Sequence, residues 1–198
     1  MCQMKSLQFF DAAGNLILRG IPSCLDNITF WKKSSSSTTH LDYFTKEGKL
    51  YYLVTAGQRD IELEIKTSLQ IQQEVYTLKG VPLSLMIVVD MSSNKLIGRI
   101  RFKMGELSQL QSFNLSNNFL MGSVPNSFQN LKNMESLNLS CNKLSGEIPY
   151  ELVVLTSLST FIVAYNNLLG RVPFDWQFST FETKSYDGNV IQSNAYLQ

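Results

Sequence analysis

The chain has 198 residues, a formal net charge of +1 at pH 7 and a hydrophobic fraction of 44%. This composition allows a folded core and gives no basis for binding nucleic acid or an anionic membrane. No apolar run approaches the ~18 residues of a membrane span, and Cys2, Cys24 and Cys141 form neither a zinc-binding nor a disulfide pattern.

The first element in chain order is an irregular repeat at residues 1–28. It shares the spacing of more regular repeats further along the chain at five positions: Leu7, Phe10, Asn15, Ile21 and Pro22. Arg19 occupies the place where the later repeats have glycine. We therefore expect a degenerate copy of the same structural unit.

Residues 29–82 break the repeat. They contain a Ser/Thr-rich run at 34–39 and two alternating stretches, at 50–55 and 61–67, that are typical of strands. We expect an inserted island that forms a small flap of its own.

Four copies of a 24-residue unit follow, over residues 83–178. The same step separates the asparagines and the glycines, which are Asn94, Asn118, Asn142 and Asn166, and Gly98, Gly122, Gly146 and Gly170. Paired apolar residues such as Leu137 and Leu139 predict a strand too short to be stable alone, so copies must stack into a parallel sheet. The asparagine is expected to bond backbone groups at the bend after the strand, and the glycine to supply unusual backbone angles.

The pattern therefore predicts a solenoid, a right-handed coil with a parallel sheet on its concave face and an irregular or 3-10 convex face. The unit resembles the plant-specific leucine-rich repeat, LxxLxxLxLSxNxLxGxIPxxL. Together with the island and the segment "QFSTFETKSYDGN" at 177–189, it resembles the juxtamembrane end of plant leucine-rich-repeat receptor-like proteins.

The resemblance implies a parent chain with a signal peptide, many more coils, a Cys-bearing cap and a transmembrane helix. Residues 179–198 are expected to be a tail without that cap, and the sequence to be a fragment or truncated product. The implied location of the parent is the extracellular side of the plasma membrane.

We expect no enzymatic activity and no cofactor or metal site. The sequence has one histidine, His40, and none of the common nucleophile or phosphate-binding motifs. Glu62 and Glu64 share a strand face beside Lys66, which is more typical of a solvated surface than of a catalytic pair.

The concave face is the first candidate binding surface. Asp90, Asn114, Asn138 and Ile162 occupy one outward strand position in successive repeats. Regularly spaced side chains on a rigid sheet suit recognition, but the same residues could serve only to keep the sheet soluble.

The last coil is the second candidate, with Tyr165, Asn167, Arg171, Phe174 and Trp176 as predicted binding residues. The resemblance implies that such coils, with the island, hold a peptide or protein ligand or contact a coreceptor kinase ectodomain. The competing interpretation is that Phe174, Trp176 and Phe178 close the end of the core.

Three sequons are candidate glycosylation sites, at Asn27, Asn114 and Asn138. The function we predict is non-catalytic recognition of a peptide or protein in plant defence or developmental signalling. The alternatives are a secreted inhibitor of cell-wall-degrading enzymes and a degenerate fragment without independent activity.

Overall fold

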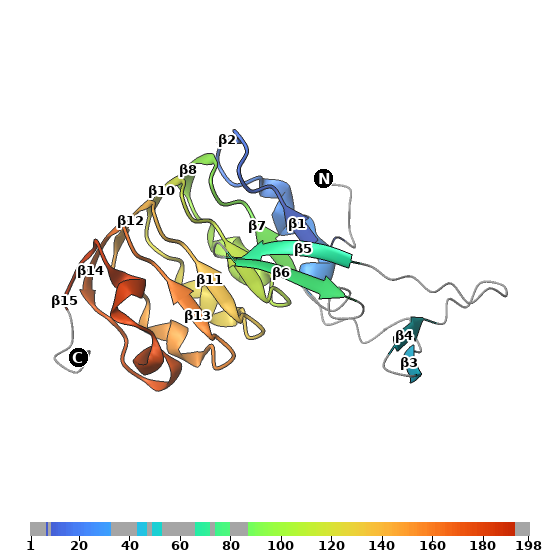
Figure 1. Cartoon of the computed structure of the whole chain (residues 1–198). Coiled ribbons are helices and arrows are strands. Elements are labelled where there is room, and N and C mark those ends of the chain that lie inside the picture. Colours follow the sequence, from blue (N-terminus) through green and yellow to red (C-terminus); the bar gives the residue numbers. More distant parts are fainter. Residues whose placement is uncertain are drawn as a thin grey trace. The chain divides into compact units, whose positions relative to one another are not determined.

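The computed structural model describes residues 7, 9–32, 43–46, 49–52, 66–71, 74–79 and 87–192. The chain divides into two compact units: residues 1–34 with 87–198, and residues 35–86. We call the first the solenoid and the second the insertion. Figure 1 shows the coils of the solenoid stacked in chain order.

A five-stranded parallel sheet, the first sheet, forms one side of the solenoid in the order β1-β7-β9-β11-β13. The central residues Phe10, Val89, Phe113, Leu137 and Phe161 align across it and point to the core. The predicted solenoid is confirmed, and the irregular first repeat pairs in the same register as the others. The strands are β1 (Phe9–Asp11), β7 (Val88–Asp90), β9 (Ser112–Asn114), β11 (Ser136–Asn138) and β13 (Thr160–Ile162).

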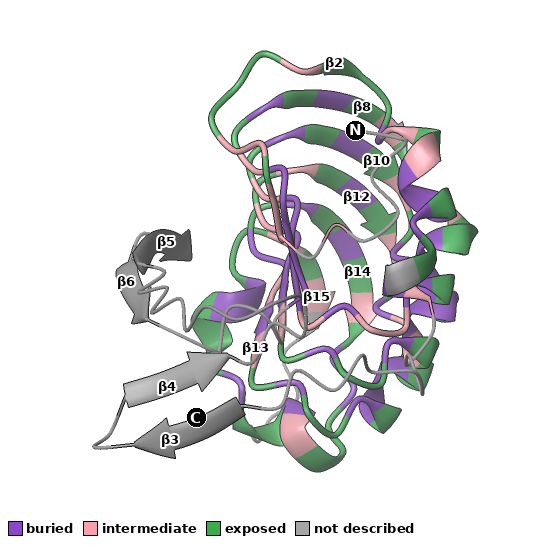
Figure 2. Cartoon of the chain, turned by 90° about the vertical axis from the view of Figure 1, so that its right-hand side faces the viewer, coloured by how far each residue is buried: buried purple, intermediate pink, exposed green. Residues whose placement is uncertain are grey.

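A second parallel sheet, which the sequence did not predict, has six strands in the order β15-β14-β12-β10-β8-β2. Its inward leucines, such as Leu120 and Leu144, are fully buried, and its alternate residues are exposed. Figure 2 shows these strands one behind another beside the 3-10 helices. The strands are β2 (Leu18–Arg19), β8 (Lys95–Arg99), β10 (Phe119–Gly122), β12 (Lys143–Gly146), β14 (Asn167–Arg171) and β15 (Val190–Gln192).

The repeated asparagine joins each coil to the one before it. The Asn118 Nδ2 donates to its own turn at Leu115 O and to the preceding coil at Met91 O, both at 3.0 Å. Its Oδ1 accepts from the backbone nitrogen of Leu96 at 3.0 Å. The asparagine ladder therefore satisfies backbone groups that the bend leaves unpaired, as expected.

Two positions in each coil have a left-handed backbone. One is the glycine, and in the first coil Arg19 takes this place with a φ of 82°, the angle that the glycine slot requires. The other, not predicted, precedes the asparagine: Ser93, Asn117, Cys141 and Tyr165, with φ between 52° and 57°.

Short 3-10 helices complete the coils and pack apolar residues against both sheets. Phe128 lies 6.2 Å from Phe113, and Phe178 lies 5.1 Å from Phe161, measured between ring centroids. The helices are η1 (Ser23–Asn27), η2 (Thr29–Trp31), η3 (Phe102–Glu106), η4 (Asn126–Asn130), η5 (Tyr150–Val154), η6 (Trp176–Thr180) and η7 (Thr183–Tyr186).

The insertion begins later than the expected boundary at residue 29. Trp31 is fully buried in the solenoid core, and its carbonyl accepts a hydrogen bond from the Gln109 nitrogen at 2.9 Å. A large aromatic side chain at this point keeps residues 29–31 with the first coil.

The C-terminal segment also differs from the expected tail. β15 pairs with β14, and Asn189 continues the ladder by accepting from the Leu168 nitrogen at 2.9 Å and donating to Val163 O at 3.0 Å. The Val163 and Tyr165 nitrogens donate to carbonyls of the same segment. Residues 183–192 thus form a further, shorter coil, because Asn189 follows Asn166 after 23 residues, one fewer than the repeat.

The insertion contains two antiparallel hairpins. They are β3 (Tyr43–Lys46) with β4 (Lys49–Tyr52), and β5 (Lys66–Ile71) with β6 (Glu74–Lys79). The expected strand at 50–55 overlaps β4. Most of the one expected at 61–67 lies outside the described residues.

Candidate binding surfaces

The first sheet aligns the predicted concave row. Asp90, Asn114, Asn138 and Ile162 pair on neighbouring strands, and Asp11 of β1, which sequence reasoning missed, extends the row by one strand. Paired strands place equivalent side chains about 4.8 Å apart. The row is therefore a regular array of carboxylates and amides that ends on an apolar residue.

Hydrogen bonds fix the polar members of this row. The Asn114 Nδ2 donates to Asp90 Oδ2 at 2.9 Å, and its Oδ1 accepts from the Ser116 nitrogen at 3.1 Å. Asn138 Oδ1 accepts from both the nitrogen and the hydroxyl of Ser140. Asp90, Asn114 and Asn138 are only 7–9% exposed, so these side chains stabilise the turns and offer a ligand little accessible surface.

The five predicted residues of the last coil do not form one patch. Tyr165 lies at the turn after the first sheet, Asn167 begins β14 and Arg171 ends it. Phe174 and Trp176 follow, near the start of η6. All five are exposed, but they extend along the coil from one sheet to the other side of the solenoid.

The aromatic residues of this coil have different roles. Phe178 is fully buried and contacts Phe161 and Phe181, so it closes the end of the core. Trp176 is 76% exposed and Phe174 38% exposed. The interpretation that all three close the core is therefore wrong for Trp176 and Phe174.

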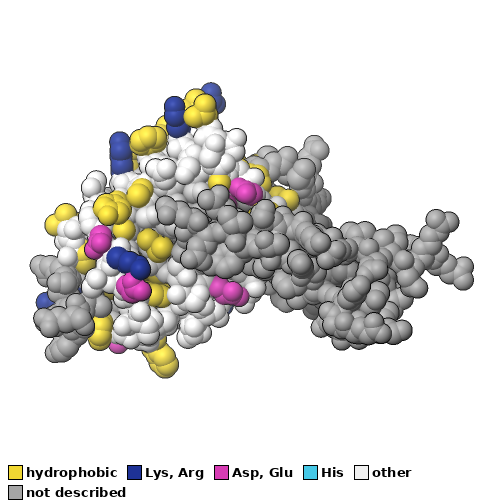
Figure 3. Space-filling view, in the orientation of Figure 1, with side chains coloured by type: hydrophobic (Ala, Val, Ile, Leu, Met, Phe, Trp, Pro, Cys, Tyr) yellow, Lys and Arg dark blue, Asp and Glu magenta, His cyan; other side chains and the backbone are white. Residues whose placement is uncertain are grey.

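The outer side of the second sheet is a surface that sequence reasoning missed. Figure 3 shows hydrophobic side chains interspersed with Lys and Arg along the edge where β2, β8, β10 and β12 lie. Its exposed hydrophobic residues are Leu18, Ile97, Phe119, Met121, Leu169 and Val190. Lys143 lies over the Phe119 ring, 5.4 Å from its centroid. Several of these positions recur every 24 residues in the sequence. Because no strand was predicted there, the recurrence did not indicate that they share one surface.

The sequons fall in different environments. Asn27 is exposed at the end of η1, whereas Asn114 and Asn138 are buried on the first sheet. Of the cysteines, Cys141 is free and exposed, and Cys24 is disulfide-bonded, which three widely spaced cysteines did not allow us to predict.

Among the residues that the structure describes, no three His, Cys, Asp or Glu side chains lie close enough together to hold a metal ion. No helix of that part of the chain is long and apolar enough to cross a bilayer.

Comparison with known proteins gives a match between residues 108–168 and the leucine rich repeat family. A stretch of 123 residues is 38% identical to receptor-like protein 8 of Arabidopsis thaliana, and it covers 56% of this chain but only 12% of that relative.

Solved structures from the same plant are similar. The ectodomain of BIR2 is 36% identical, with a TM-score of 0.50 over 54% of this chain and 56% of that one. A chain of the BIR3–SERK2 complex is 34% identical, with a TM-score of 0.51 over 54% and 57%. The receptor kinase HAESA, solved with the peptide hormone IDA and the co-receptor SERK1, covers 98% of this chain and 27% of its own, at 17% identity and a TM-score of 0.61. This last similarity concerns the fold alone.

Proposed function

We propose that this leucine-rich-repeat chain, similar in sequence and fold to plant receptor-like proteins and receptor ectodomains, is a segment of the extracellular part of a plant cell-surface receptor-like protein. It recognises a peptide or protein ligand without catalysing a reaction, in defence or developmental signalling. A co-receptor kinase ectodomain of the SERK kind is its second partner. A chain of the BIR3–SERK2 complex, 34% identical to this chain, was solved in an assembly that contains a SERK protein.

One observation carries the proposal. Tyr165 and Trp176 are 61% and 76% exposed, and both have a left-handed backbone, with φ of 57° and 54°. Bulky residues are rare at such angles, and the strain costs on the order of 1–3 kcal/mol each. Exposed aromatic side chains in a strained backbone favour neither stability nor solubility, so their presence supports a role in binding.

The disulfide at Cys24 supports an extracellular location, because disulfides persist mainly in oxidising compartments.

The test uses a purified SERK-type ectodomain as the probe and surface plasmon resonance as the measurement. The double variant Tyr165→Asn/Trp176→Gly places residues that tolerate a left-handed backbone at both positions. We expect it to unfold at higher urea concentration than the native chain while its affinity falls at least about tenfold.

Val154→Ala, a truncation at an exposed position of η5, is the matched control and should change neither quantity. Unchanged affinity in the double variant, or no binding by the native chain, would contradict the proposed co-receptor contact.

A further inference from the structure

Apolar and basic side chains lie together on the exposed face of β8, β10 and β12 in the second sheet. We call them the apolar–basic patch, and its residues are Lys95, Ile97, Arg99, Phe119, Met121 and Lys143. Ile97, Phe119 and Met121 are 51%, 45% and 47% exposed. Strand pairing sets Ile97 beside Phe119, and it sets Met121 between Arg99 and Lys143. The apolar side chains are therefore bordered by cations on neighbouring strands.

The repeat itself does not require apolar residues at these positions. Ile97, Met121, Ser145 and Leu169 occupy one position of successive repeats, and the serine shows that a polar residue fits there. The position of Phe119 carries lysine in the repeats on both sides. Because clustered apolar side chains on a surface lower solubility, such a cluster is typical of a surface that contacts a partner.

The patch has a positive charge that is only partly balanced. Neither Lys95 nor Arg99 has a hydrogen bond or ion pair among the described residues, and the Lys143 ammonium lies 5.4 Å from the centroid of the Phe119 ring. Glu147 is the one carboxylate in these three strands and the four residues on either side of each. With Glu147 counted, three cations and one carboxylate leave a balance of +2.

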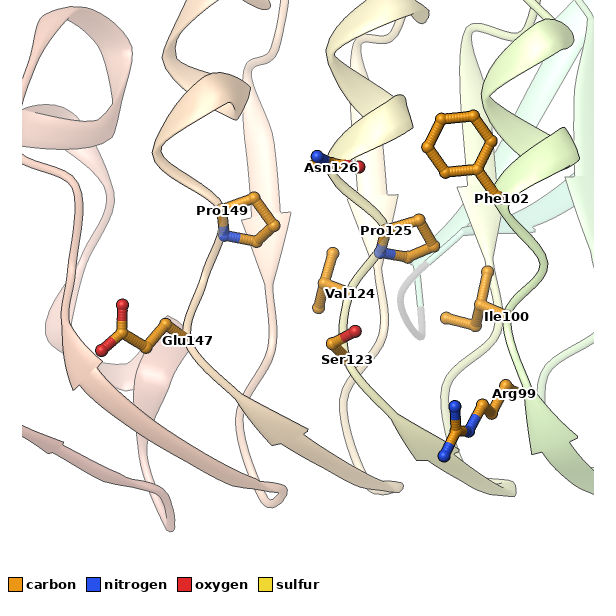
Figure 4. A pocket seen from close by; sticks show the side chains of 9 residues that line it. All are labelled: Arg99, Ile100, Phe102, Ser123, Val124, Pro125, Asn126, Glu147 and Pro149. Atoms are coloured by element: carbon orange, nitrogen blue, oxygen red, sulfur yellow. The ribbon is translucent and has the colours of Figure 1, made fainter.

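Glu147 lies away from the basic residues of β8. Figure 4 shows Arg99 and Glu147 toward opposite ends of a hollow of 490 Å³, with the coil that carries Ser123 between them. A Cβ added at Gly170 of β14 would lie 2.8 Å from the Glu147 Cγ, and β14 is the neighbour of β12 on the side away from β10. The cations of β8 are therefore available to a partner.

We propose that the apolar–basic patch binds an acidic amphipathic helix of a partner protein. Apolar side chains of the helix pack on the three apolar residues of the patch, and its carboxylates pair with the three cations. The patch shares no residue with the co-receptor contact tested above, so the inference does not depend on the function proposed there.

The spacing of the strands suits a helix that lies across them. Neighbouring strands are about 4.8 Å apart, and one turn of an α-helix rises about 5.4 Å, so successive turns meet successive strands. Arg99, Met121 and Lys143 share one register on three strands. A helix with acidic, apolar and acidic residues on three successive turns therefore brings a carboxylate to each cation and an apolar side chain to Met121.

A protein partner fits this patch better than a lipid surface or a polysaccharide does. Its apolar residues are about half exposed on the face of a sheet, whereas binding to a membrane buries apolar groups about 5–10 Å deep. An anionic polysaccharide can pair with the cations but has few apolar groups to cover the three apolar side chains.

The test measures binding of fluorescein-labelled peptides to the full 198-residue chain by fluorescence anisotropy. The first peptide, of about 15 residues or four helical turns, has Glu and Leu on one helical face and Ala and Gln elsewhere. The second has the same composition in scrambled order. We expect saturable binding of the first peptide that weakens as the salt concentration rises, and at least about tenfold weaker binding of the second.

Truncation of the apolar residues assigns the site. Phe119→Ala and Met121→Ala should each weaken binding of the amphipathic peptide about tenfold or more. Phe102→Ala is the matched control, because Phe102 is also an exposed phenylalanine but begins η3 (Figure 4), and it should leave the affinity unchanged.

Charge reversal tests the basic residues separately. The double variant Arg99→Glu/Lys143→Glu should bind the acidic peptide about tenfold more weakly or worse. It should also bind a peptide with Lys in place of Glu, which the native chain should not bind. Lys132→Glu, at an exposed position between η4 and β11, is the matched control and should do neither. Circular dichroism verifies that each variant is folded.

Equal affinity for the amphipathic and scrambled peptides, or a double variant that behaves like Lys132→Glu, would overturn the proposal. Binding to vesicles of phosphatidylserine and phosphatidylcholine that the patch variants abolish, without binding of the peptide, would overturn it too and would assign the patch to a membrane surface. The same result with an anionic polysaccharide in place of the vesicles would assign it to that class of ligand.

Discussion

Arg101 occupies the position where the next three coils have proline, and it links the coil before the insertion to the coil after it. Its Nη2 bonds Asp26 Oδ1 at 2.8 Å, its Nε bonds Asp26 Oδ2 at 3.0 Å, and the guanidinium also donates to the carbonyls of Ile21 and Pro22. The Asp26 side chain is only 10% exposed. Arginine therefore replaces proline here because it binds a buried carboxylate and two carbonyls of the first coil, and the repeat pattern alone does not predict such a contact.

We expect Arg101→Pro to destabilise the chain by about 3 kcal/mol, although it restores the repeat residue. The change leaves a buried carboxylate and two carbonyls without their partner. Arg101→Lys keeps the charge but not the two-point contact and should cost less. Urea unfolding measures both, and a loss below about 0.5 kcal/mol for Arg101→Pro would show that the contact does not stabilise the fold.

Tyr186 gives a dependence of stability on pH. It is buried, its hydroxyl has no hydrogen-bond partner in the described part of the chain, and burial raises its pKa above the usual 10.0. As the pH rises, Tyr186 therefore ionises in the unfolded chain before it ionises in the folded chain. The folded state keeps its full stability below about pH 10 and loses stability as the pH rises further.

We expect Tyr186→Phe to be more stable by about 1 kcal/mol at pH 7, because it removes an unpaired buried hydroxyl. It should also lose less stability than the native chain between pH 9 and pH 11. Urea unfolding at the three pH values measures this, and a less stable variant would mean that the hydroxyl makes a bond that stabilises the fold.

The sequons should be used unequally. Asn27 is exposed, whereas Asn114 and Asn138 are buried in the hydrogen-bonded row of the first sheet. In chain secreted from plant cells with an added signal peptide, glycopeptide mass spectrometry should find a glycan on Asn27 and essentially none on Asn114 or Asn138. Substantial occupancy at either buried asparagine would contradict the described environment of the row.

The asparagine ladder is the element on which the coils depend most directly. Asn142 donates to Leu115 O, Leu139 O and Ser140 O, and its Oδ1 accepts from the Leu120 nitrogen. We expect Asn142→Ala to cost about 1–3 kcal/mol, because several backbone groups lose their partner.

Asn130→Ala is the matched control, since Asn130 is exposed at the end of η4 and its side chain has no hydrogen bond among the described residues. It should change stability by less than about 0.5 kcal/mol. Chemical denaturation of both variants distinguishes the two positions, and equal losses would contradict the ladder's role.

The sequence predicted the elements that repeat exactly. The first-sheet strands, the asparagine bend and the glycine bend followed from the 24-residue step, and the register of Asp90, Asn114, Asn138 and Ile162 followed with them. The second sheet did not, because strands of two to five residues with a glycine near the end lack a strand pattern. The exposed hydrophobic surface of that sheet was missed for the same reason.

At the scale of the whole molecule, the insertion leaves and rejoins the solenoid at neighbouring points. The Trp31 carbonyl accepts from the Gln109 nitrogen, and the Ile87 carbonyl accepts from the nitrogens of Gln111 and Ser112. Two residues of extended chain span about 7 Å, so the ends of the insertion are close enough for a short linker.

We therefore expect the chain to stay folded when a linker of about six Gly and Ser residues replaces residues 33–86. Its circular dichroism should keep a cooperative thermal transition, within about 5 °C of the native chain. When the same replacement is combined with Arg101→Ala, the midpoint of the thermal transition should fall further. The Arg101–Asp26 contact, which joins the coils on the two sides of the linker, is then lost. Aggregation or loss of cooperativity in the first variant would mean that the insertion stabilises the solenoid.

The junction also affects the order in which the solenoid folds. Contacts between later coils join residues 24 apart, as in Asn114 with Asp90, whereas Arg101 and Asp26 are 75 apart. Closing the longer loop costs about 1 kcal/mol more in chain entropy. Folding should therefore begin among the coils after the insertion and end with docking of the first coil, which makes that coil the first to detach when the native chain opens locally.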